Sequence, residues 1–190
     1  TPTTVAASPL PAGSLVVAAG HGWTAAALDG PVPAPGTCTY AHADGYLLPD
    51  PRCTPGAVDP AVTQGDLDST ICRSGGYTDS VRPPYALTEP FKREVEAAYR
   101  DPSPTDQTEL DHLVPLGLGG ASDTRNLWPE PDQGTPAAFD PSDPYGINAK
   151  DGVEDRLHDA ICSGQADLAA AQAAIATDWT TALSRLGLAP

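Results

Sequence analysis

The sequence predicts an α+β protein: an irregular, disulfide-bonded N-terminal half, a strand–turn–strand–loop–helix unit, and a closing C-terminal helix. The 190 residues include 22 Pro and 18 Gly, well above the combined share of about 12% in an average protein, so much of the backbone must form loops. Hydrophobic residues make up 40% of the chain, which is enough for a globular core. Sustained helical periodicity is found only after residue 86, and two short apolar runs beside a glycine pair indicate strands.

The first 52 residues differ from the rest and are expected to form an N-terminal extension with short strands. Residues 1–14 are small, polar and rich in proline, as in a linker. Asp44-Gly45 is a typical hairpin turn. Residues 53–190 are expected to form the main domain, with a core unit over about residues 108–162.

The four cysteines are Cys38, Cys53, Cys72 and Cys162, and no two of them form a C-x-x-C pair. An even number without metal-ribbon spacing indicates disulfides, and four cysteines allow three pairings. We expect Cys38 to pair with Cys53, because the hairpin turn between them folds their flanks together. Cys72 is then left to pair with Cys162. Disulfides, the absence of Met and a chain that begins Thr-Pro-Thr-Thr favour a secreted protein whose signal peptide has been removed.

The charge balance limits the partners. The net charge is −15, from 25 acidic and 10 basic residues, which argues against a protein that wraps nucleic acid by charge alone. Six of the ten basic residues fall between residues 52 and 100, so a polyanion is expected to meet its cationic face there, at Arg82, Lys92 and Arg93. No apolar window is long enough to cross a bilayer, so no membrane partner is expected.

Helices are expected on both sides of the strand pair. The first covers residues 87–100, with Thr88 as N-cap and Pro90 in the first turn. The second covers residues 148–162 and is followed by glycine. A last, continuous helix is expected over about residues 166–186, with the apolar positions on one face.

Two short strands are expected within residues 108–118 and 126–128, joined by a turn that contains Gly119-Gly120. On the first strand, Asp111 and His112 are adjacent, so their side chains should point to opposite faces unless the strand is twisted or bulged. The carboxylate is a hard ligand for a divalent cation, and the imidazole can take a proton near neutral pH. The pair therefore marks a candidate site.

The residues around this pair carry a family resemblance. The run ELDHLVPL over residues 109–116 is followed by the glycine turn and by NLWP over residues 126–129. This pattern resembles the HNH endonuclease family, in which D-H-[IV]-x-P-L, a glycine-rich turn and N-L form a ββα-metal (His-Me finger) unit. Residues 150–164 and 70–84 resemble further parts of a secreted bacterial branch of HNH-like proteins. The resemblance covers roughly residues 53–180 and implies a ββα-metal unit.

The resemblance also implies roles for individual residues. His112 matches the general base that takes a proton from the water attacking a phosphodiester, and Asn126 matches the Asn that pins the hairpin loop and orients this base. Asp111 matches a ligand of one divalent metal ion, with Mg²⁺ or Mn²⁺ expected first and Zn²⁺ or Ni²⁺ as alternatives. Asn148 is the best match to the second metal ligand.

The third motif departs from the family pattern, because no His stands where the commonest version has one. Asp151 or Glu154 therefore remains an alternative to Asn148, since carboxylate oxygens suit the same hard cation. The function expected from the resemblance is a secreted, metal-dependent endonuclease that cuts DNA with little sequence preference and needs no obligate protein partner. The alternative is a non-catalytic extracellular interaction domain on the same scaffold.

Overall fold

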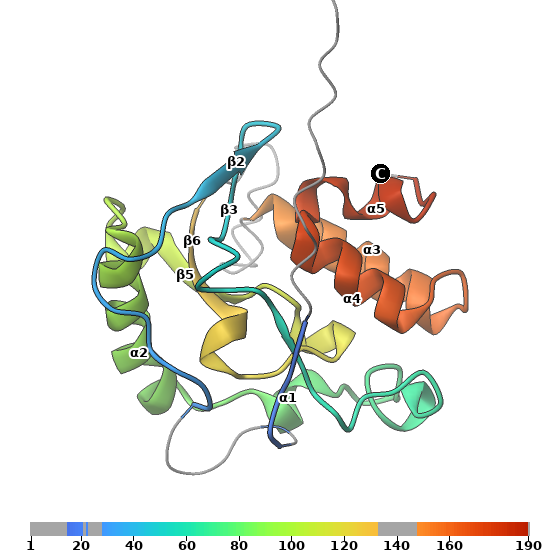
Figure 1. Ribbon diagram of the computed structural model, residues 1–190. Coiled ribbons are helices and arrows are strands. Elements are labelled where there is room, and N and C mark those ends of the chain that lie inside the picture. The colour runs from blue at the N-terminus through green and yellow to red at the C-terminus, as the bar shows by residue number, and fades with distance from the viewer. Residues whose placement is uncertain (1–14, 21, 23–27, 133–147, 190) are drawn as a thin grey trace, which may run out of the picture.

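The computed structural model describes residues 15–20, 22, 28–132 and 148–189, and it is a mixed α+β structure (Figure 1). The prediction of a mixed α+β fold is therefore confirmed. The strands are β1 Val16–Val17, β2 Ala41–Ala43, β3 Tyr46–Leu48, β4 Ala57–Val58, β5 Thr108–His112 and β6 Leu127–Pro131. The helices are α1 Thr78–Val81, α2 Tyr85–Tyr99, α3 Ala149–Cys162, α4 Leu168–Thr177 and α5 Ala182–Arg185. The residues 1–14 of the predicted linker, His21 and Trp23 lie outside the described residues.

The strands form three separate pairs. β1 and β4 are parallel, β2 and β3 form an antiparallel hairpin, and β5 and β6 form the central antiparallel pair. The predicted turn at Asp44-Gly45 is confirmed: both residues have positive φ, 51° and 87°, as a two-residue hairpin turn requires. Because β1 pairs with β4 beyond residue 52, the N-terminal segment is joined to the rest by backbone hydrogen bonds.

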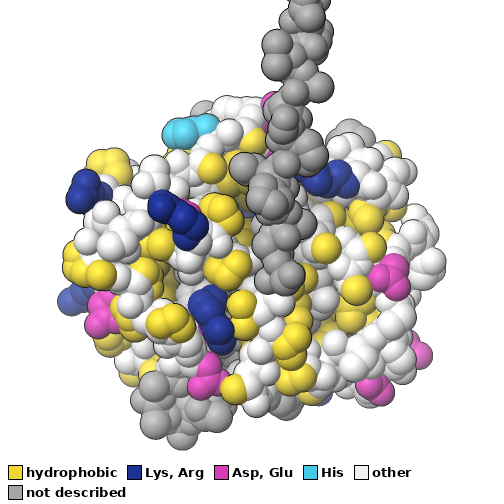
Figure 2. Space-filling view, viewed as in Figure 1, with side chains coloured by type: hydrophobic (Ala, Val, Ile, Leu, Met, Phe, Trp, Pro, Cys, Tyr) yellow, Lys and Arg dark blue, Asp and Glu magenta, His cyan; other side chains and the backbone are white. Residues whose placement is uncertain are grey.

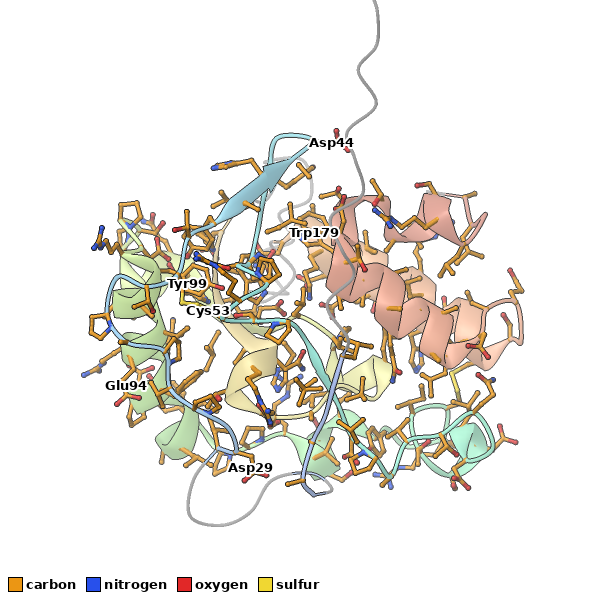
Figure 3. The ribbon with its side chains drawn as sticks, in the orientation of Figure 1. Asp29, Asp44, Cys53, Glu94, Tyr99 and Trp179 are labelled. Atoms are coloured by element: carbon orange, nitrogen blue, oxygen red, sulfur yellow. A yellow bond between two sulfur atoms is a disulfide. The ribbon has the colours of Figure 1, made fainter. Side chains whose placement is uncertain are left out.

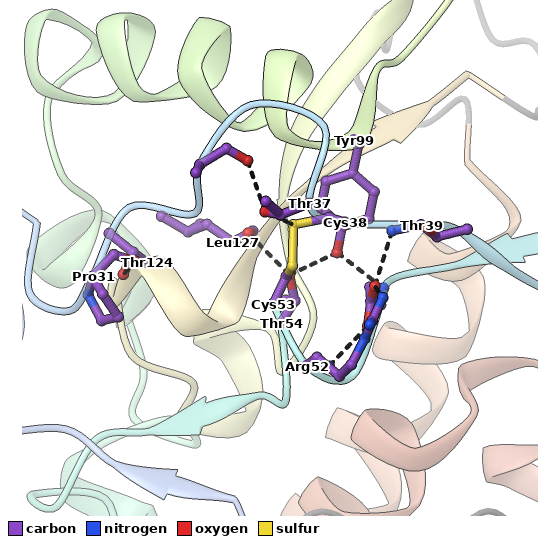
Figure 4. Close-up of a disulfide and its surroundings, with 12 residues drawn as sticks. Pro31, Thr37, Cys38, Thr39, Arg52, Cys53, Thr54, Tyr99, Thr124 and Leu127 are labelled. Carbon is purple, nitrogen blue, oxygen red and sulfur yellow. Dashed lines mark hydrogen bonds and ion pairs between the residues drawn. A yellow bond between two sulfur atoms is a disulfide. The ribbon is translucent and has the colours of Figure 1, made fainter.

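Both predicted disulfides are present, Cys38–Cys53 and Cys72–Cys162. The first lies beside a buried polar network (Figure 4). There the Tyr99 hydroxyl is 2.9 Å from Thr54 Oγ1 and accepts a hydrogen bond from the Asp50 amide, also at 2.9 Å. The network attaches the end of α2 to the segment after the β2–β3 hairpin.

The helix α2 begins at Tyr85, three residues before the predicted N-cap Thr88, so that prediction was wrong. Pro84, in an extended conformation, precedes the helix, and the Thr88 amide already donates to the Pro84 carbonyl. Pro90 therefore lies inside the helix, on its exposed side, while Phe91 and Val95 are buried. Figure 1 shows α2 on one side of the β5–β6 pair and the helices α3 to α5 on the other.

The predicted C-terminal helix is broken into α4, a 3₁₀ turn and α5. The break is at Asp178, whose backbone is extended (φ −169°, ψ 100°) and whose side chain accepts a hydrogen bond from the Thr180 amide. The apolar face survives the break because Ile175, Trp179 and Leu183 all remain buried. Trp179 reaches the β2–β3 hairpin and donates to the Leu47 carbonyl at 3.2 Å (Figure 3).

Two large groups of apolar side chains and a small third one, of Ala18, Ala57 and Ala121, are buried among the described residues. One of the large groups lies between α2 and the central strands and includes Phe91, Val95 and Trp128, and the other gathers under α3 and α4 and includes Leu157 and Ile175. Trp128 is fully buried, as expected of a core residue. Among the described residues, no helix is long and apolar enough to cross a membrane. The two disulfides fit an oxidising environment.

Candidate functional site

The candidate site is built on the β5–β6 pair, in which Asp111 is opposite Trp128 and His112 is opposite Leu127. The connection between the strands is fixed by Asn126. Its Oδ1 accepts hydrogen bonds from the amides of Val114 (2.9 Å) and Ala57 (3.1 Å), and its Nδ2 donates to the carbonyls of Val114 and Ala121, both at 2.9 Å. A fully buried amide with four partners fixes the loop that follows His112.

The loop between the strands also depends on close backbone packing at Gly120. A Cβ atom at this position would lie 1.7 Å from the Val114 carbonyl oxygen. The Gly120 amide donates to the Pro115 carbonyl at 2.9 Å. The loop therefore folds back on the segment that leaves His112 at a distance only glycine permits.

Asp111 is buried, and one of its carboxylate oxygens interacts with two donors. Its Oδ2 accepts from Trp128 Nε1 at 2.7 Å and lies 2.8 Å from Lys150 Nζ. Lys150 is fully buried, donates to the His112 carbonyl at 3.0 Å, and also pairs with the Glu154 carboxylate. Burial by itself would lower the pKa of Lys150, but the carboxylates of Asp111 and Glu154 outweigh it and hold the pKa above its usual range. The ammonium therefore ties α3 to the end of β5.

His112 is also buried, and its Nε2 lies 3.1 Å from Ser122 Oγ. Burial lowers the pKa of His112 to about 4; the positive charges of Arg82 and Lys150 act in the same direction and the Asp111 carboxylate opposes them. The imidazole is thus neutral at pH 7. In the tautomer that donates from Nε2 to Ser122, the Nδ1 lone pair is available to accept a proton.

The carboxylates around Asp111 outnumber the nearby cations. Burial, followed by repulsion from Asp111, raises the pKa of Glu109 to about 7 and that of Asp151 to about 6. Burial also raises the pKa of Glu154 to about 8, although Lys150 opposes the shift. Glu130 is paired with Glu109 across the two strands, and burial raises its pKa well above the usual range. These raised pKa values mean that Glu109, Glu130 and Glu154 keep their protons to higher pH than ordinary carboxyl groups, which limits the negative charge packed around Asp111.

The donors of this cluster are of the chemical kind that a divalent cation takes, although no three His, Cys, Asp or Glu side chains of the described residues are grouped to hold one. Asp151 Oδ2 is buried and has no hydrogen-bond partner among the described residues. Asn148 Nδ2 donates to Glu109 Oε2 at 3.3 Å, which places the predicted ligand Asn148 beside the carboxylates. Carboxylate and amide oxygens are the ligands that Mg²⁺ and Mn²⁺ prefer. Asp111, Asn148 and Asp151 are the residues that would hold such an ion.

The cluster opens on a groove of about 1090 Å³. Its basic lining residues, Arg73, Arg82 and Lys92, all come from the segment that includes α1 and the first half of α2. Its acidic lining residues are Glu89, Asp106, Glu109, Asp111, Asp132, Asp151, Glu154 and Asp155. On the face drawn in Figure 2, Lys and Arg side chains lie apart from one another, with no continuous basic patch.

The structure brings most of the predicted site residues together. His112, Asp111 and Asn148 line the groove, as do the predicted phosphate contacts Arg82 and Lys92. Arg93 is not among the lining residues; it is exposed and pairs with Glu89 at 2.9 Å. The fully buried Asn126 lies in the loop beneath the groove.

Sequence reasoning missed Lys150, Ser122 and Glu130. Lys150 and Glu154 are four residues apart, the spacing of an ion pair on one helical face, and this signal could have found the pair. Nothing in the sequence indicates that Lys150 is buried. Comparisons with protein-family models, with curated proteins and with solved structures gave no match to this chain.

Proposed function

We propose that this protein is a secreted, metal-dependent endonuclease of the HNH type that hydrolyses phosphodiester bonds of DNA. The observation that carries the proposal is the meeting of the neutral His112 imidazole and the Asp111–Asp151 carboxylates at one groove that Arg82 and Lys92 also line. In this proposal β5, β6 and α3 form the ββα-metal unit. Phosphodiester hydrolysis needs a base and a stabiliser of negative charge, and this groove supplies residues for both.

Each residue has a defined task in this proposal. His112 takes the proton from the attacking water, and a substrate phosphate close to the ring would raise its low pKa because a negative charge favours imidazolium. Asn126 and Ser122 hold the loop and the ring in place. A cation held by Asp111, Asn148 and Asp151 would neutralise the phosphate and stabilise charge on the leaving oxygen.

The proposed substrate is DNA cut with little sequence preference. Arg82 and Lys92 are suited to phosphate contacts, which position a nucleic acid without reading its bases. Among the charged residues that line the groove, acidic ones outnumber Arg and Lys by eight to three. Binding is therefore expected to be weak and to fall steeply with salt.

The test is cleavage of circular DNA, in duplex and single-stranded form, with Mg²⁺ or Mn²⁺ and with EDTA. His112→Ala should abolish cleavage, as should EDTA, while the control His42→Ala, on the exposed β2 strand, should cleave like the wild type. Circular substrates are used because only an endonuclease can open them. Cleavage that survives His112→Ala in a folded protein would show that the base is elsewhere.

A second candidate is a non-catalytic extracellular interaction domain. It is favoured by one observation: Asp111 Oδ2 already holds Lys150 and Trp128, so the site is internally paired. This alternative predicts no cleavage with any cation and no change in melting temperature when Mn²⁺ is added to the folded protein. A metal-induced rise in melting temperature that Asp151→Asn removes would count against it.

A further inference from the structure

Tyr85 is an exposed aromatic residue on the lining of the groove. Val17, Val32 and Tyr85 are the large hydrophobic residues most exposed among the described ones, and Tyr85, with 74% of its surface accessible, is the only one of these three in the groove. The other groove tyrosine, Tyr77, is buried. An exposed ring beside phosphate-binding residues is the arrangement that proteins use to stack unpaired bases.

Tyr85 shares one face of α2 with Glu89 and Arg93. An interaction with the Glu89 carboxylate, one helical turn further on, raises the pKa of Tyr85. Glu89 is in turn held by Arg93, whose Nη2 lies 2.9 Å from Glu89 Oε1. The three residues are spaced four apart on the same helical face, so Glu89 and Arg93 follow the ring along that face.

Two basic residues of the groove flank this ring in the sequence. Arg82 is exposed three residues before Tyr85, and Lys92 lies two helical turns after it. Lys92 donates to the Thr105 carbonyl at 2.6 Å, which leaves other N–H groups of the ammonium for a ligand. The third basic residue, Arg73, is occupied: it packs over the Tyr77 ring and donates to the Gly76 carbonyl and the Ser80 hydroxyl.

The remainder of the groove lining is unfavourable for a second phosphate backbone. Apart from Glu89, its acidic residues come from the segments around 106–111, 132 and 151–155, and none of the basic lining residues does. A duplex carries two phosphate strands, whereas a single strand needs cations along one path only. The carboxylates of Asp106, Asp132 and Asp155, which lie outside the proposed cation site, would repel a second strand and therefore favour an unpaired one.

From the exposed ring, the basic residues near it and this charge distribution, we propose that the groove binds single-stranded nucleic acid, with one base stacked on Tyr85 and adjacent phosphates at Arg82 and Lys92. The inference rests on the proposed nuclease function and narrows its substrate. In a duplex the faces of the bases are covered by their neighbours, so Tyr85 has no base to stack on. A single strand or an unpaired loop offers that face.

Binding is tested in EDTA, so that nothing is cleaved, by fluorescence anisotropy with three DNA probes: a single-stranded oligonucleotide, its duplex, and the same backbone without bases. The wild type should bind the single strand at least about 5-fold more tightly than the abasic probe, the lower end of one stacked base. Tyr85→Leu should lose this difference, and Tyr85→Phe should keep it. Leucine keeps apolar area without a π face, so the pair separates stacking from simple burial.

Two results would overturn the inference: equal binding of the single strand and the abasic probe by the wild type, or an unchanged preference in Tyr85→Leu. A single-stranded RNA of the same sequence is measured in the same assay, and comparison with the DNA shows which of the two nucleic acids the groove binds more tightly. Cleavage separates the two proposals. If neither circular substrate is cut with any cation, the nuclease function fails, whereas if the duplex circle is cut as fast as the single-stranded one, only the substrate assignment fails.

Discussion

Lys150 and Asp111 form a buried ion pair, with 2.8 Å between Nζ and Oδ2, that joins the first turn of α3 to the penultimate residue of β5. The same ammonium donates to the His112 carbonyl at 3.0 Å. One side chain thus fixes the carboxylate and the backbone of the neighbouring histidine together. The pair explains how α3 is held against the strands at the point where the proposed chemistry takes place.

Removing the ammonium should strongly destabilise the fold. Lys150→Met keeps the length of the side chain but leaves the carboxylates of Asp111 and Glu154 buried without a cation, and breaking one side of a buried pair typically costs about 3–5 kcal/mol. Urea denaturation in EDTA measures this loss. Lys92→Met, which removes a partly exposed lysine, is the control and should cost less than about 1 kcal/mol. A similar small loss for both variants would show that the pair contributes little.

Two glycines of the same loop should respond differently to alanine. Gly120→Ala places a Cβ 1.7 Å from the Val114 carbonyl oxygen, so the backbone must move. We expect the free energy of unfolding to fall by at least about 3 kcal/mol. At Gly117 the nearest atom is 3.8 Å away, on the His158 ring. Gly117→Ala should therefore change the free energy of unfolding by less than about 0.5 kcal/mol. Equal melting temperatures for the two variants would contradict the packing described here.

The two disulfides should contribute unequally. Cys38–Cys53 closes a separation of 15 residues and Cys72–Cys162 one of 90, and the chain-entropy argument assigns about 3 and about 4.6 kcal/mol to loops of these sizes. The paired substitutions Cys38→Ala/Cys53→Ala and Cys72→Ala/Cys162→Ala compare them by denaturant unfolding. The second pair should be the more destabilised. The reverse order would show that the unfolded chain is not the main source of the effect.

Stability should fall as the pH rises from about 6.5 to about 8 in metal-free buffer. Glu109 and Glu154 have folded pKa values of about 7 and about 8, above their unfolded values, so the folded state binds more protons in this range and loses stability as they leave. His112, with a folded pKa of about 4, acts in the opposite direction, but only between about pH 4 and its unfolded value of about 6.5.

Glu109→Gln tests whether Glu109 is one of the groups that cause this pH dependence, because the amide stays neutral like the protonated acid. The fall in melting temperature between these pH values should become smaller in this variant. The control is Glu94→Gln, since Glu94 lies on the exposed side of α2 (Figure 3) and its removal should leave the slope unchanged. A slope in Glu109→Gln identical to that of the wild type would place the titrating group elsewhere.

The sequence by itself determined the parts of the fold that depend on local chemistry. Asp44-Gly45 predicted a hairpin because two adjacent residues with positive φ are what such a turn needs, and that hairpin in turn predicted both disulfides. The presence of a strand pair and the helix over residues 148–162 followed from apolar periodicity and glycine placement. The strand bounds did not: the first strand ends at His112, with a 3₁₀ turn over Leu116–Leu118, and the second runs on to Pro131. The sequence also predicted Asp111 and His112 as a candidate site, because the two residues are adjacent on one short strand.

The tertiary structure alone decided what depends on burial. Lys150 is an ordinary lysine in the sequence and becomes a buried link only because α3 packs against β5. The break at Asp178 and the start of α2 at Tyr85 were likewise set by packing and capping that propensity does not show. The shifted pKa values of His112 and Glu109 arise from desolvation by segments far apart in the chain. Desolvation depends on the whole set of neighbours, which a local pattern cannot contain.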